Sequence, residues 1–145
     1  MNYLQRAIDL SKASFDAGEF PAGAVLVTKS GNVYESKPSV PYNHGETMVI
    51  DMAIEAEGAP LDGAVMYGSM QPCLMCSAKM YWTGITEAHY VIAKRDVRAE
   101  YAYEDATDTS EVAANFFTAI SMTQAPELSK EALAIYTAWV AKIEG

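Results

Sequence analysis

The sequence predicts an α/β fold, in which helices cover a central sheet that is at least partly parallel. Two observations carry this expectation. Short apolar runs rich in β-branched residues alternate with longer stretches of helical periodicity, and glycine and proline separate the two kinds of segment. Such alternation is typical of sheets with helices packed on them. With 145 residues, half of them hydrophobic, the chain fits one domain spanning residues 1–145.

The N-terminal segments predict a helix followed by a hairpin. Apolar residues at helical spacing extend over residues 2–17, and Gly18 is a suitable stop. The period then changes, since residues 23–28 form a short β-branched apolar run. A turn-like stretch over residues 29–32 leads into a second short strand at residues 33–34.

The middle of the chain predicts two helices separated by a strand. The first helix covers residues 44–57. Its apolar face contains long side chains: Met48, Met52 and Ile54. A strand follows at residues 64–69, and the second helix opens at once over residues 71–83, because proline is well placed in a first helical turn.

The C-terminal part is less regular. A fourth strand is expected at residues 88–93, followed by a polar loop or irregular helix over residues 96–111. A fifth strand is expected near residues 116–122. The chain then ends in a helix over residues 129–143, with Ser129 as its N-cap.

Charge and composition restrict the class of partner. The net charge is -9, with ten Lys plus Arg against nineteen acids, whereas nucleic-acid binding draws on Lys and Arg that displace counterions from phosphates. A nucleic-acid partner is therefore disfavoured, although four basic residues in one region could form a local patch: Lys79, Lys94, Arg95 and Arg98. The N-terminal helix lacks the apolar core of a signal peptide, and no stretch approaches the ~20 apolar residues of a membrane span. We expect a cytoplasmic protein.

Two fragments carry the chemistry: His44-Gly45-Glu46 and Pro72-Cys73-Leu74-Met75-Cys76, each at the start of an expected helix. Alone, the histidine could be structural, and the CxxC pair could belong to a thioredoxin-like redox site. Together they match the H-x-E and P-C-x-x-C signature of zinc deaminases. Both cysteines of the chain and one of its two histidines fall in this pattern.

The residue types suit a catalytic zinc. Two thiolates and an imidazole, from Cys73, Cys76 and His44, are good ligands for one Zn²⁺ per chain, and three protein ligands leave the fourth tetrahedral position open. Glu46 can take a proton from the attacking water, pass it to a substrate ring nitrogen and later protonate the leaving ammonia. The expected reaction is hydrolysis at an amino-bearing ring carbon.

The chain resembles the cytidine-deaminase superfamily, in particular the branch of bacterial guanine deaminases, fungal-type cytosine deaminases and tRNA adenosine deaminases. The resemblance lies in residues 21–27, the two zinc fragments and residues 78–82, with the Tyr-Trp pair of guanine deaminases. It implies a three-layer α/β/α sandwich with a five-stranded mixed sheet, and a homodimer. Residues 99–105 resemble an aromatic and acidic pocket segment of guanine deaminases. Four candidates for substrate binding follow: Asn43, Gly45, Trp82 and Asp105.

The chain also departs from the family pattern. Gly45 stands where alanine is usual and Gln71 where glutamate is common, no asparagine occurs in residues 35–39, and the tail lacks an aromatic end. The leading hypothesis is therefore a deaminase of a small nucleobase, nucleoside or related amino-heterocycle, with guanine as the first substrate. A tRNA adenosine or single-strand deaminase is the alternative. A non-catalytic structural-zinc or redox CxxC protein is the third hypothesis.

Overall fold

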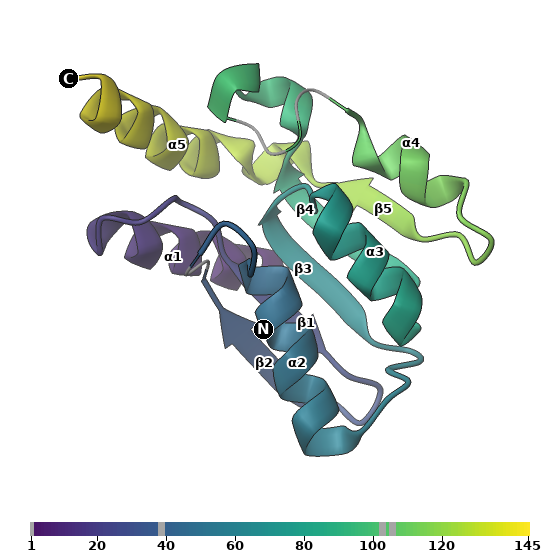
Figure 1. Ribbon diagram of the computed structural model, residues 1–145. Coiled ribbons are helices and arrows are strands. Elements are labelled where there is room, and N and C mark those ends of the chain that lie inside the picture. Colours follow the sequence, from purple (N-terminus) through teal and green to yellow (C-terminus); the bar gives the residue numbers. More distant parts are fainter. Residues whose placement is uncertain (1, 38–39, 102–103, 105–106) are drawn as a thin grey trace.

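A five-stranded mixed sheet runs through the molecule in the order β2-β1-β3-β4-β5 (Figure 1). The computed structural model describes residues 2–37, 40–101, 104 and 107–145. Strand β1 pairs antiparallel with both β2 and β3, whereas β3, β4 and β5 are parallel to one another. The strands have these bounds: β1 Ala24–Val27, β2 Val33–Ser36, β3 Val65–Met70, β4 Glu87–Ile92 and β5 Ser121–Gln124.

Helices cover both faces of this sheet. Helices α1 (Tyr3–Asp16) and α5 (Ser129–Glu144) pack against each other on one face. On the other face lie α2 (Gly45–Glu57), α3 (Leu74–Thr83) and the short α4 (Thr109–Ala114) (Figure 1). The predicted three-layer α/β/α sandwich with a five-stranded mixed sheet is confirmed. No helix in the described part of the chain has the length and apolar content to cross a membrane.

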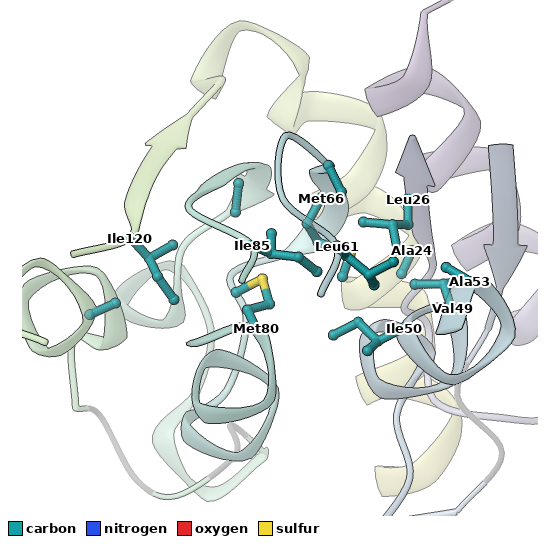
Figure 2. Packing of buried hydrophobic residues seen from close by; sticks show 13 residues of the cluster. Ala24, Leu26, Val49, Ile50, Ala53, Leu61, Met66, Met80, Ile85 and Ile120 are labelled. Carbon is teal, nitrogen blue, oxygen red and sulfur yellow. The ribbon is translucent and has the colours of Figure 1, made fainter. Parts of the chain in front are cut away.

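The face of α2 that packs against the sheet differs from the predicted apolar face. Val49, Ile50 and Ala53 are fully buried, and Figure 2 shows them beside the strand residues of the same cluster. Met52, expected on the apolar face, is instead 41% exposed. Apolar residues surround much of this helix, so spacing alone does not select the side that meets the sheet.

Two C-terminal predictions also needed correction. Strand β5 begins only at Ser121, because the preceding residues form a turn in which the Ile120 N–H donates to the carbonyl of Ala113 at 3.1 Å. Ser129 does not cap α5. Its hydroxyl donates to the carbonyl of Pro126 at 2.6 Å, and Leu128 occupies the N-cap position.

Candidate metal centre and active site

The N-termini of α2 and α3 converge on three side chains that could hold a metal ion. His44 precedes α2 and Cys73 precedes α3, both with extended backbone, while Cys76 lies in the first turn of α3. Nδ1 of His44 lies 3.4 Å from the sulfur of Cys73 and 3.6 Å from that of Cys76. The two sulfurs are 3.3 Å apart.

These spacings fit zinc. Tetrahedral zinc with sulfur and nitrogen ligands holds the ligand atoms roughly 3.6–3.8 Å apart, so the observed triangle needs little adjustment. Both sulfurs are buried, and the backbone N–H of Cys76 donates to the Cys73 sulfur at 3.3 Å. The positive end of a helix therefore faces a soft, anionic ligand.

The pKa values of the two thiols are shifted in opposite directions. The hydrogen bond between the two thiols lowers the pKa of Cys73 to about 5, against the effect of burial. The same hydrogen bond, with burial, raises the pKa of Cys76. The hydrogen bond with Cys73 raises the pKa of His44, whose ring also hydrogen-bonds the backbone of Pro41. The sulfur of Cys73 is thus readily anionic. The hydrogen bond with the Pro41 backbone fixes the orientation of the His44 ring.

Glu46 lies in the first turn of α2, next to the triangle formed by His44, Cys73 and Cys76. The residue is only 7% exposed, and its Oε2 lies 3.7 Å from the sulfur of Cys76. Burial raises the pKa of Glu46 to about 7. Gly68 of β3 lies against this carboxyl: a Cβ there would contact Oε1 at 3.4 Å and would clash with the Met70 carbonyl oxygen at 2.8 Å. A carboxyl group with this pKa can both accept and release a proton near neutral pH.

A cavity of about 690 Å³ opens beside His44 and Glu46. Three aromatic residues from separate parts of the chain form an apolar wall: Phe20, Tyr101 and Trp139. The Trp139 ring packs edge-on against Phe20 at 4.8 Å and against Tyr101 at 5.5 Å between centroids. This volume suits a single heterocycle or nucleoside.

The family of the chain follows from its match to a known family model. The model for the cytidine and deoxycytidylate deaminase zinc-binding region matches residues 1–92. The chain belongs to this deaminase family. The family is a zinc-binding one, and the triangle of His44, Cys73 and Cys76 lies within the matched residues.

Relatives in the deaminase family act on different substrates. The probable cytosine deaminase of Schizosaccharomyces pombe is 33% identical over 88 residues, which cover 57% of this chain but only 54% of that protein. The guanine deaminase of Bacillus subtilis is 32% identical over 110 residues, covering 71% of this chain and 70% of that protein. A solved structure from work on tRNA:A34 deaminases, which carry out A-to-I editing at the wobble position, has a TM-score of 0.68. It is 26% identical, covering 85% of this chain and 96% of that one.

The four substrate-binding candidates lie in different places. Gly45 lines the cavity. Asn43 does not line it, and its Oδ1 accepts a 2.7 Å hydrogen bond from the hydroxyl of Thr47. Trp82 is 80% exposed on α3 and is not brought to the cavity. Asp105 lies outside the described residues.

Sequence reasoning missed several lining residues. Phe20 and Trp139 carried no local signal, because they belong to the loop after α1 and to α5, which meet only in the folded chain. Tyr101 and Glu104 fall in the aromatic and acidic segment over residues 99–105, in which the sequence predicts Asp105 as the binding residue. Glu104 lines the cavity, and its Oε1 accepts the Leu74 backbone N–H at 3.1 Å.

Proposed function

We propose that the protein is a zinc-dependent hydrolytic deaminase of a small amino-heterocycle. His44, Cys73 and Cys76 hold one zinc ion per chain in this proposal, and Glu46 transfers protons. The observation that carries the proposal is the position of the Glu46 carboxyl. It is buried beside the ligand triangle and borders the cavity. Purely structural zinc sites usually have four protein ligands and no buried acid beside an open cavity.

The chemistry is divided between the metal and the acid. Zinc held by the three ligands would supply a Lewis acid that lowers the pKa of water. Glu46 accepts a proton from the attacking water and delivers it to the ring nitrogen next to the amino-bearing carbon. The same carboxyl then takes the remaining proton from the new hydroxyl group on that carbon and gives it to the departing amine, so that ammonia leaves and a carbonyl remains. A pKa of about 7 suits both directions of transfer.

Guanine is the first substrate to test, with cytosine, nucleosides and related heterocycles after it. The similarity to the Bacillus subtilis guanine deaminase, over 70% of that protein, supports this order. The aromatic wall supports a planar substrate, because heterocycles stack on aromatic rings. A homodimer and a cytoplasmic location stay predictions from the sequence.

Ammonia release by purified protein of known zinc content tests the proposal. We expect about one zinc per chain and turnover of at least one compound in a panel of guanine, cytosine, adenine, their nucleosides and amino-triazines. Glu46→Gln should keep the zinc and lose activity by roughly 10²–10⁴-fold. Absence of zinc would favour the redox CxxC hypothesis. Zinc with no turnover of small molecules, but with inosine formed in tRNA, would favour the tRNA deaminase alternative.

A further inference from the structure

The titratable groups that line the cavity are mostly acids. Besides Glu46, the carboxylates of Glu19, Glu100 and Glu104 border it. Among the lining residues that the structure describes, none is lysine or arginine. The amino acids at positions 38–39, 102–103 and 105–106 also include no basic residue. The cavity therefore offers acceptors for N–H donors and no lysine or arginine for an anion.

Three of these acids are each paired with a cationic side chain that does not itself line the cavity. Nζ of Lys94 lies 3.2 Å from Oε1 of Glu104, and the Lys94 side chain is only 2% exposed. Lys37 pairs with Glu19 at 3.2 Å. Arg98 pairs with Glu100 and, at 2.7 Å, with Glu144 of α5. A ligand that needs a cation would have to break one of these pairs.

The zinc would add little positive charge to this balance. Two cysteine thiolates formally cancel the charge of Zn²⁺, so the metal centre would not act as a strong anion site. Phosphate, in contrast, carries about -1.5 to -2 charges at neutral pH and binds through several N–H donors. The carboxylates that line the cavity already bind the neighbouring lysine and arginine side chains, so they compete with a phosphate for these donors.

On the basis of the proposed deaminase function, we propose that the cavity selects phosphate-free heterocycles. A free base or a nucleoside is accepted, whereas a nucleoside 5′-monophosphate is excluded by the carboxylates of Glu100, Glu104 and Glu19. The aromatic wall binds the ring, and the acids discriminate by charge.

The fluorescence of Trp139, which lines the cavity, gives a readout of binding that is separate from ammonia release. The chain has two tryptophans, and Trp82 is exposed away from the cavity, so Trp82→Phe leaves Trp139 as the single reporter. Fluorescence titrations of zinc-loaded Trp82→Phe protein would use guanine, guanosine and guanosine 5′-monophosphate, with the matching cytosine and adenine series. For the base that binds, we expect the monophosphate to bind more weakly than the nucleoside by roughly tenfold or more at low salt. The ratio of the dissociation constants of monophosphate and nucleoside should decrease as the salt concentration increases.

A charge reversal provides the second measurement. Glu100→Lys, in the Trp82→Phe background, should improve binding of the monophosphate. The ratio of the dissociation constants of monophosphate and nucleoside should therefore decrease several-fold. Glu55→Lys makes the same charge change on the exposed face of α2, away from the cavity, and should leave the ratio unchanged.

The outcomes separate this inference from the proposed function. Equal or tighter binding of the monophosphate would overturn the inference while leaving deamination intact. Loss of nucleoside and monophosphate alike would assign the selection to size and overturn the role of charge, and binding of no compound in the series would also overturn it. Selective nucleoside binding without ammonia release would instead overturn the proposed function and leave the selection by charge supported.

Discussion

The side-chain amide of Gln71 donates a 2.9 Å hydrogen bond to Oδ1 of Asp108. The same Nε2 donates to the hydroxyl of Ser110 at 2.8 Å, and the Oε1 accepts the Lys94 backbone N–H at 2.9 Å. Gln71 is 2% exposed, so these bonds satisfy an amide that water does not reach. Asp108 in turn caps α4. This position therefore needs a donor, which glutamine supplies and an ionised glutamate would not.

Gln71→Glu should destabilise the protein by about 2–4 kcal/mol at pH 7. The change replaces the donor to Asp108 with a buried carboxylate, which leaves two acceptors facing each other. Burial and repulsion would raise the pKa of the introduced carboxyl, so the penalty should decrease as pH falls and that carboxyl is protonated. Chemical denaturation at pH 5 and pH 8 measures this. Asp108→Asn should restore part of the lost stability, and no restoration would refute the proposed repulsion.

The side chains of Lys94 and Glu104 should be strongly coupled in their contributions to the free energy of unfolding. Glu104→Ala leaves the buried Lys94 ammonium without this carboxylate and should cost about 1–3 kcal/mol of unfolding free energy. Lys94→Met removes the charge and keeps an apolar side chain of similar length. In a double-mutant cycle, Glu104→Ala should therefore cost much less when Lys94 is already methionine. Additive effects would show that the pair contributes nothing beyond its separate side chains.

Glu57 should make stability sensitive to acid. Its carboxylate accepts hydrogen bonds from four β1–β2 hairpin side chains: Tyr34, Ser30, Thr28 and Asn32. The bond from Tyr34, followed by that from Ser30, lowers the pKa of Glu57 to about 2 from an ordinary 4.5. Because the folded pKa is the lower one, this stabilisation is present above about pH 4.5 and is lost as pH falls toward 2.

The measurement for Glu57 is the melting temperature between pH 7 and pH 2. Glu57→Gln should flatten the acid-induced decrease relative to the parent protein. Glu55→Gln, an exposed acid on the same helix, is the matched control and should follow the parent curve. Identical curves for Glu57→Gln and Glu55→Gln would rule out a specific role for the hairpin contacts.

The inner face of α2 should dominate its contribution to stability. Ile50→Ala removes a fully buried side chain from the cluster against the sheet and should cost about 2–5 kcal/mol. Met52→Ala removes a side chain of similar size that is 41% exposed and should cost well under 1 kcal/mol. Urea denaturation of both variants compares the two faces. Comparable costs would contradict the burial pattern of the helix.

Local signals in the sequence determined the elements and the reactive centre. Glycine marked the end of α1 near Gly18, and proline with the CxxC spacing placed Cys73 and Cys76 at the start of α3. These features depend on neighbouring residues alone, because capping, turn conformation and the spacing of residues in one helical turn act within a few positions. The signature of His44, Glu46 and the two cysteines indicates the zinc-binding deaminase family without any knowledge of the fold.

Tertiary structure decided which apolar side chains are buried and which of them surround the cavity. Ile120 is buried although it lies in the loop before β5 and not in the expected strand, since it packs in the core cluster with Ala113 of α4 and Met122 of β5. Phe20, Tyr101 and Trp139 meet because α1 and α5 pack together on one face of the sheet. Burial and side-chain contacts of this kind depend on segments that are distant in the sequence. The spacing of residues within one segment therefore does not predict them.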